Sequence, residues 1–128
     1  MIPLPLLFVF SLAAPFLLWP VEYFLPYPYL IEELFKAGIV RYLPPATPFR
    51  TVLFLALIFS LSESVFYLFN FLALGSLHGL GYRLLFTSAL HLLTFSLLFL
   101  GKKRLFLALP LSILIHYLFN LFVSALPR

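Results

Sequence analysis

The fold is decided by one apolar stretch, TVLFLALIFSLSESVFYLFNFLAL, which covers residues 51–74 and carries one charged side chain, Glu63. A helix needs about 20 apolar residues to cross ~30 Å of hydrocarbon at ~1.5 Å per residue, and this stretch is long enough. Residues 2–19, 82–100 and 105–126 have the same character. The first of them lacks the basic region of a secretory signal. We therefore predict four membrane-spanning helices.

The composition agrees with a membrane environment. Apolar residues make up 64% of the 128 residues and charged residues only 9%, and the mean hydropathy is +1.14. Soluble domains carry about 25% charged residues, and a chain of this length has too little interior to bury so much apolar surface. These values exclude a soluble enzyme, a disordered tail and a nucleic-acid binder, and the absence of cysteine excludes disulfides. We predict an all-α transmembrane bundle that forms a single integral membrane domain over residues 1–128.

A shorter apolar segment lies between the first two predicted spans, at residues 29–43. Prolines flank it, at positions 26 and 28 before it and at positions 44, 45 and 48 after it. Proline is accepted where a helix begins and just beyond its end, but not in its interior. We expect one helix of about four turns that packs inside the bundle. A helix lying on the membrane surface is the alternative.

Basic residues orient the predicted bundle. Their only cluster, Lys102–Arg104, lies in the short loop between the last two spans. Cytoplasmic loops are enriched in lysine and arginine, so we place this loop in the cytoplasm. Counting back along the chain puts Arg41 and Arg50 on the same side and the loop at residues 75–81 outside. If the short helix also crosses, the amino terminus is inside and the carboxyl terminus outside.

Several ionisable side chains are predicted to lie deep in the membrane. They are Glu63, His91 and His116 near the centres of three long spans, and Glu32 and Glu33 in the short helix. A charged side chain at the bilayer centre costs about 3 kcal/mol on insertion scales, so a purely structural bundle would insert more readily with leucine in these places. The three residues of the long spans also fall at nearly one depth. We expect all five groups to converge on one site.

Helical spacing places some of these groups side by side. Lys36 follows Glu33 by three residues and Glu32 by four, so it can partly neutralise both carboxylates. His116 and Asn120 are four residues apart and share a helix face. Most of these groups also have a structural explanation: a histidine can bond a backbone carbonyl, an asparagine can join two helices, and an interfacial helix can keep its carboxylates wet. Glu63 has none, because it lies too deep for its carboxylate to reach the membrane surface.

Four short motifs resemble the PrsW family of intramembrane proteases, which belongs with the CAAX prenyl protease and Abi (CPBP) group. Residues 32–36 (EELFK) match its EExxK motif and residues 59–63 (FSLSE) its FxxxE element. Arg83 with His91 resembles the third motif, and residues 116–120 (HYLFN) resemble the HxxxN ending. The motifs follow the family order on successive predicted helices. One departure is Ser64, where the family usually has asparagine.

The resemblance implies a peptidase of a prokaryotic cell membrane that cleaves a membrane-embedded protein or peptide. Peptide hydrolysis needs a base for water, donors for the oxyanion and an acid for the leaving amine. The resemblance favours Glu32 as the base and Glu33 as its orienting partner. In the same reaction His91 could hold the water or move its proton, and His116 and Asn120, which share a helix face, could donate hydrogen bonds to the oxyanion.

The residues alone leave other assignments open. Two neighbouring carboxylates lose their protons at different pH values, so one can act as a base while the other stays protonated as an acid. Glu63 could form such a pair with either glutamate of the short helix. No cofactor is expected for that reaction, but Glu63, His91 and His116 are suitable zinc ligands and could serve a metal-dependent version of it. The same midplane groups would suit a proton relay in a transporter. A non-catalytic membrane protein that keeps the family fold is the remaining alternative.

Overall fold

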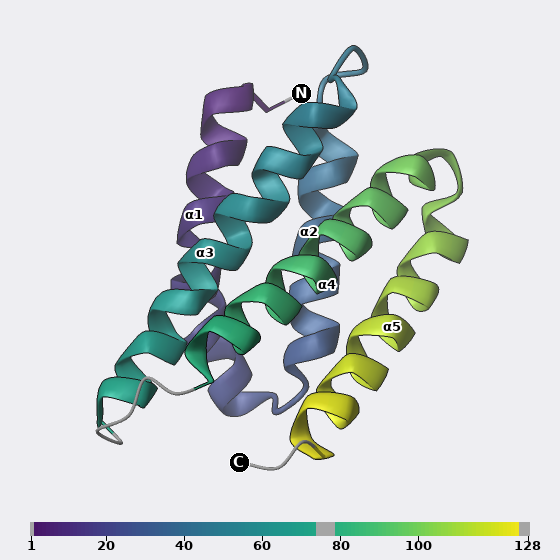
Figure 1. Ribbon diagram of the computed structural model, residues 1–128. Coiled ribbons are helices and arrows are strands. Elements are labelled where there is room, and N and C mark those ends of the chain that lie inside the picture. Colours follow the sequence, from purple (N-terminus) through teal and green to yellow (C-terminus); the bar gives the residue numbers. More distant parts are fainter. Residues whose placement is uncertain (1, 74–78, 126–128) are drawn as a thin grey trace.

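The computed structural model of the chain describes residues 2–73 and 79–125 (Figure 1). Within these ranges the chain forms α-helices and one short 3-10 helix, and no strand. The helices are α1 (Leu4–Phe24), α2 (Pro28–Tyr42), α3 (Phe49–Ala73), α4 (Leu80–Leu100), η1 (Lys102–Arg104) and α5 (Leu105–Ala125). The predicted all-α class is confirmed.

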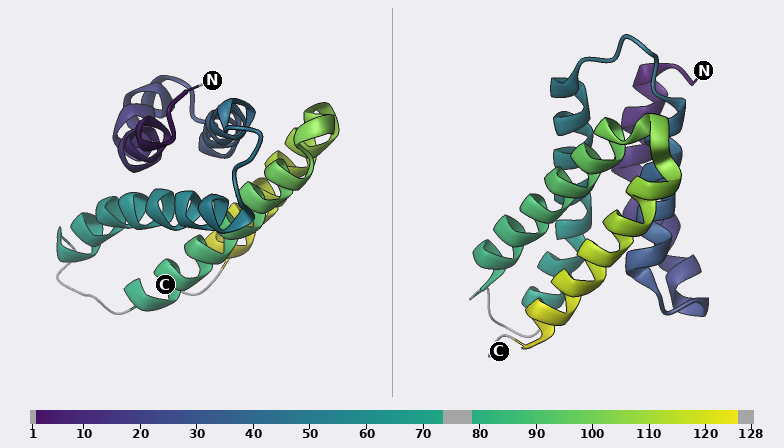
Figure 2. Two further views of the ribbon diagram at one scale, coloured as in Figure 1. Left: turned by 90° about the horizontal axis from the view of Figure 1, so that it is seen from above. Right: turned by 90° about the vertical axis from the view of Figure 1, so that its right-hand side faces the viewer.

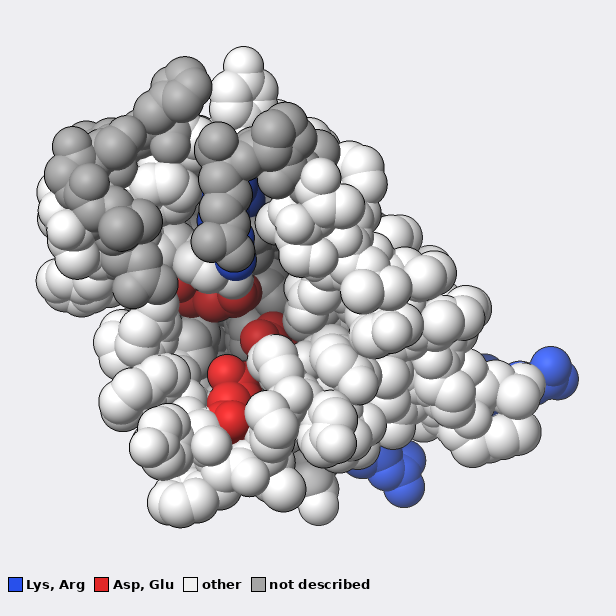
Figure 3. Space-filling view, turned by 90° about the horizontal axis from the view of Figure 1, so that it is seen from below, with Lys and Arg blue, Asp and Glu red and all other residues white. Residues whose placement is uncertain are grey.

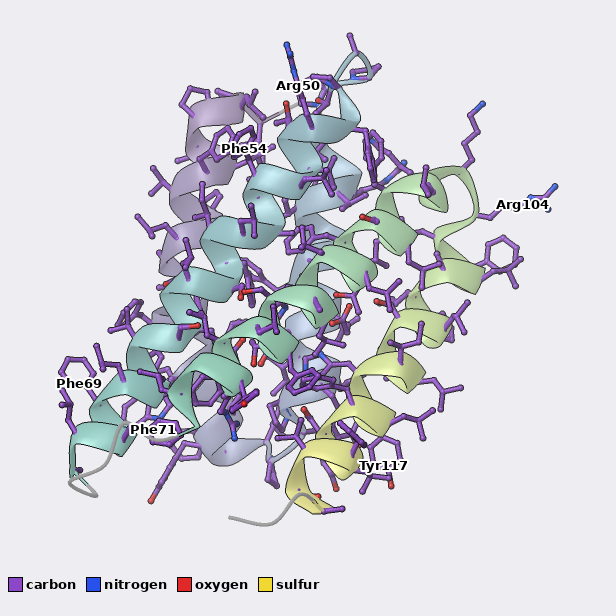
Figure 4. All side chains as sticks on the ribbon, in the orientation of Figure 1. Arg50, Phe54, Phe69, Phe71, Arg104 and Tyr117 are labelled. Carbon is purple, nitrogen blue, oxygen red and sulfur yellow. The ribbon has the colours of Figure 1, made fainter. Side chains whose placement is uncertain are left out.

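Consecutive α-helices run in opposite directions, so the two ends of the described chain lie at opposite ends of the bundle (Figure 1). The 15-residue helix α2 lies alongside α1 and also contacts α4 and α5. It therefore packs within the bundle, as predicted. Its axis runs alongside the neighbouring helices and does not lie across an end of the bundle (Figure 2). In Figure 4, Arg50 and Arg104 both lie at the upper end of the bundle.

Four helices are long and apolar enough to span a membrane: α1, α3, α4 and the segment Lys102–Ala125, which includes α5. The predicted spans are therefore confirmed, and most of their ends agree within two residues. The predicted ends at residues 74 and 126 lie outside the described residues.

The predicted end of the first span, at residue 19, is wrong because α1 continues through Pro20 to Phe24. A proline removes one backbone donor and crowds the preceding turn, which predicts a helix end in a soluble protein. Inside a bundle of membrane helices the neighbouring helices make an internal proline tolerable. Pro15 is likewise inside α1, where it is buried.

The described side chains are distributed as membrane helices require. Phe54, Leu100 and Phe106 are 59%, 76% and 75% exposed, which suits contact with lipid. Phe59 and Phe95 are fully buried between the helices, with ring centroids 5.9 Å apart. The interior also contains charged side chains, which are described below.

Small residues bring the helices close together. The hydroxyl of Ser11 donates to the carbonyl of Leu55 at 2.9 Å and so joins α1 to α3, as polar side chains commonly do between membrane helices. At the turn after α4, a Cβ on Gly101 would collide with the side chain of Ala108. Glycine is therefore required there by the close approach of α4 and α5.

Candidate active site

One group of polar side chains is built around the carboxylate of Glu63 on α3. Its Oε2 lies 2.5 Å from Nε2 of His91 on α4, and its Oε1 accepts a hydrogen bond of 2.5 Å from the hydroxyl of Tyr67. Tyr67 follows Glu63 by four residues, so both project from one face of α3. The guanidinium of Arg83 stacks on the Tyr67 ring, 3.9 Å from its centroid. Both oxygens of Glu63 are thus engaged, and His91 is held in one orientation.

Glu32 on α2 joins this group without being bonded into it. Its side chain is buried, with 8% of its surface exposed, and Oε2 has no hydrogen-bond partner among the described residues. Potential ligand atoms of Glu32, Glu63 and His91 all lie within 4.8 Å of one another. Three helices therefore bring two carboxylates and an imidazole to one point. The Nδ1 atom of His91 also has no partner there.

A cavity of about 390 Å³ borders this point. Its wall consists of Glu22, Glu32 and Glu63 together with Pro15, Trp19, Phe59, Phe66, Tyr67 and Phe69. Acidic side chains are visible inside a hollow when the bundle is viewed from its lower end (Figure 3). A water molecule takes up about 30 Å³ in the liquid, so the cavity has room for water and for part of a substrate.

A second polar group surrounds Glu33, which is fully buried. Its Oε1 accepts from Nζ of Lys36 at 2.5 Å and lies 2.8 Å from Nδ1 of His116, and its Oε2 accepts from the Ser112 hydroxyl at 2.5 Å. Lys36 is fully buried as well and donates to Thr94 at 3.2 Å. This network joins α2 to α4 and α5. A carboxylate with three such partners is firmly held and has little capacity to accept a further proton from water.

The two neighbouring glutamates therefore have different surroundings. Glu32 faces the cavity with an unpaired oxygen, whereas Glu33 is enclosed in the hydrogen-bonded network. The two groups adjoin each other through His91 and His116, whose rings meet edge to face with centroids 6.1 Å apart. Lys36 lies 5.2 Å from the centroid of Phe59, which is part of the cavity wall. The charged interior is continuous, with one side open to a cavity.

The expected site residues fall into these two groups, with one exception. Asn120 shares a face of α5 with His116, but it is only partly buried and makes no hydrogen bond to another described residue. His116 itself faces Glu33 and does not line the cavity. The expected zinc ligands also differ from the observed arrangement, because Glu32 takes the place of His116 beside Glu63 and His91.

Four contributors to these groups were not expected from the sequence. Tyr67 and Ser112 each lie four residues from an expected residue, Glu63 and His116, so helical spacing could have indicated them. Thr94 follows the expected His91 by three residues, so the same spacing could have indicated it. Glu22 was missed because the first span was expected to end before it, whereas the continuation of α1 through Pro20 brings Glu22 to the cavity wall.

The fold and these buried groups define a class, an α-helical membrane protein with an ionisable site inside its helix bundle. No family model matches the chain, and no curated protein or solved structure is significantly similar to it.

Proposed function

We propose that this protein is an intramembrane endopeptidase that hydrolyses a peptide bond in or beside a transmembrane segment of a protein or peptide. The observation that carries the proposal is the unpartnered Oε2 of Glu32 at the cavity, beside the Glu63–His91 pair. A buried carboxylate without a partner is costly, and a purely structural bundle gains nothing from it. A hydrolase needs such a group as the base that activates water.

In this proposal Glu32 takes a proton from a water molecule in the cavity, and the water oxygen attacks the carbonyl carbon of the substrate. The electron pair of the carbonyl moves to its oxygen, the C–N bond then breaks, and Glu32 returns the proton to the departing amine. Glu63 already has donors on both oxygens, so it serves to position the water, and His91 holds Glu63. Tyr67 offers a hydroxyl at the cavity wall; its one proton is donated to Glu63 in the structure, and we assign it to the oxyanion through a switch from Glu63 to the substrate oxygen as the tetrahedral intermediate forms.

The motifs support the same reaction. The resemblance to the PrsW family implies that the first glutamate of EExxK is the base, which agrees with the different surroundings of Glu32 and Glu33. The ion pair between Glu33 and Lys36 agrees with an orienting role for the second glutamate. His116 and Asn120 receive no role at the oxyanion in this proposal, because neither lines the cavity.

We further propose a prokaryotic cell membrane with the Lys102–Arg104 turn in the cytoplasm. Nζ of Lys102 donates to the carbonyl of Leu43 at 2.8 Å, so the basic turn lies at the same end of the bundle as the C-terminal end of α2, which carries Arg41. Arg50 lies at that end too (Figure 4). Cytoplasmic enrichment of basic residues gives the orientation. The cavity is visible from the opposite end (Figure 3), so the cleaved bond would lie toward the outer leaflet.

The test uses the purified protein in liposomes with a pool of synthetic single-span peptides, in water enriched in ¹⁸O. Hydrolysis places one oxygen of water in each new carboxyl terminus, so mass spectrometry identifies genuine products. We expect labelled products from the wild type and from Lys103→Gln, a matched change of a charge to an amide far from the cavity, and none from Glu32→Gln. Equal product from Glu32→Gln refutes the proposal. Proton flux through the liposomes without cleavage would instead support the transporter alternative.

The clustering of Glu32, Glu63 and His91 favours a second candidate, a zinc-dependent form of the same reaction. Their oxygen and nitrogen donors suit zinc, and three ligands with an open side toward the cavity are typical of a catalytic zinc site. Bound zinc would polarise the substrate carbonyl and lower the pKa of a water. Elemental analysis separates the candidates: one zinc per chain that is lost in Glu63→Gln, with inhibition by a chelator, supports the metal form, and full activity without metal supports the glutamate form.

A further inference from the structure

The cavity wall has an unusual composition. Three of the four acidic residues of the chain line it, and they come from α1, α2 and α3. Apart from Pro15, the remaining lining side chains are aromatic. Carboxylates attract cations by charge, and aromatic faces attract them through the negative face of the ring, most strongly for tryptophan. The wall therefore combines two kinds of group that favour a cation.

Two of these carboxylates have no ion-pair partner among the described residues. Glu63 is paired with His91, but Oε2 of Glu32 has no partner although the side chain is more than nine-tenths buried. Glu22, which is partly exposed near the C-terminal end of α1, has no ion-pair partner among the described residues. The wall is thus able to neutralise a cation that enters.

The nearby basic side chains, Lys36 and Arg83, do not line the cavity. The ammonium of Lys36 is bonded to Glu33 and Thr94. The guanidinium of Arg83 stacks on Tyr67 outside the cavity wall, and its Nε has no hydrogen-bond partner among the described residues. An anionic ligand would meet three carboxylates, and a neutral ligand would leave those of Glu22 and Glu32 without an ion-pair partner. A cation attached to an apolar chain suits the cavity best.

We propose that the cavity receives a lysine or arginine side chain of the substrate and that Glu22 is a specificity-determining residue. This inference rests on the proposed protease function. The cationic head would lie beside Glu22 and the aromatic side chains near the mouth, while the bond to be cleaved lies deeper, beside Glu32. Glu22 has no part in the chemical step, so its removal should change the choice of substrate and not the cleavage itself.

Binding can be measured without any cleavage, because Trp19 is the only tryptophan of the chain and lies in the cavity wall. The probes are a bromine-labelled alkylguanidinium and the neutral alkylurea of equal length, added to the protein in uncharged detergent micelles, where bromine quenches Trp19. We expect the guanidinium to bind wild type and Lys103→Gln about five- to tenfold more tightly than the urea. In Glu22→Gln this difference should fall below about twofold. Equal binding of both probes to the wild type, or an unchanged difference in Glu22→Gln, overturns the inference.

Cleavage gives an independent readout with single-span peptides that differ only by arginine or glutamine beside the cleaved bond. The wild type should cleave the arginine peptide with a kcat/KM about five- to tenfold higher. Glu22→Gln should lose this preference and cleave the glutamine peptide at the wild-type rate. Cleavage without preference refutes the inference but not the protease function. Cation binding that depends on Glu22, with no cleavage of any peptide, refutes the protease function but retains the cation site.

Discussion

Exchanging Glu33 for glutamine should destabilise the protein strongly, whereas the same exchange at Glu32 should not. The carboxylate of Glu33 is fully buried and has three side-chain partners at 2.5–2.8 Å. Glutamine keeps the shape and one acceptor oxygen but removes the charge opposite Lys36. Removing one partner of a buried ion pair typically costs about 3–5 kcal/mol, which lowers the folding equilibrium constant by about 10²- to 10³-fold or more.

The neighbouring exchange is a matched control within the same helix. Oε2 of Glu32 has no partner among the described residues, so Glu32→Gln removes a buried charge without breaking a bond at that oxygen. We expect the free energy of unfolding to change by less than about 1 kcal/mol or to increase. The double exchange Glu33→Gln with Lys36→Met should recover at least half of the loss, because no unpaired charge remains.

The assay is equilibrium unfolding of the purified variants in mixed micelles with increasing amounts of sodium dodecyl sulfate, followed by circular dichroism. A loss below about 1 kcal/mol for Glu33→Gln, or equal losses for the two single variants, would refute the assignment of the two glutamates to different roles.

Three further outcomes follow from the packing and the orientation. Tyr67→Phe should lower kcat about 10²-fold, because it removes a donor assigned to the oxyanion, and steady-state kinetics with an unchanged kcat would contradict that role. Gly101→Ala should destabilise the protein by about 1–3 kcal/mol, because the new Cβ would overpack against Ala108. Gly38→Ala, where a Cβ has open space, should stabilise α2 by about 0.5–1 kcal/mol. Unfolding in mixed micelles measures both changes, and equal effects would contradict the close contact at the α4–α5 turn. The chain has no cysteine, so single cysteines can report topology: a membrane-impermeant maleimide should label Tyr27→Cys on intact cells and Lys103→Cys only after lysis, and the reverse pattern would overturn the orientation.

The sequence predicted the helices well because their apolar stretches match the thickness of a membrane. The short helix was recognisable from the prolines at positions 26–48, which flank it on both sides. The error at the end of α1 has one cause: Pro20 indicates a helix end when only the local sequence is considered, and the structure accommodates it inside the helix. Helix propensity is a property of the local sequence, so it does not include the stabilisation that neighbouring helices give to an internal proline.

The candidate site was predictable in its members but not in its connections. Depth alone brought Glu63 and His91 to one level, and they are in direct contact. Depth does not determine which face of a helix points toward which neighbour. The different surroundings of Glu32 and Glu33, and the contact of His116 with Glu33, could therefore be found only from the three-dimensional packing. Helix rotation within the bundle decides these contacts.

The central claim is that the carboxylate of Glu32 activates water for peptide hydrolysis. The most direct test is the cleavage rate of Glu32→Gln in liposomes relative to the wild type, using preparations that circular dichroism shows to be equally folded. The account predicts a loss of at least about 10³-fold with the fold intact, typical of removing a catalytic base. A folded Glu32→Gln protein that cleaves within tenfold of the wild-type rate would contradict it.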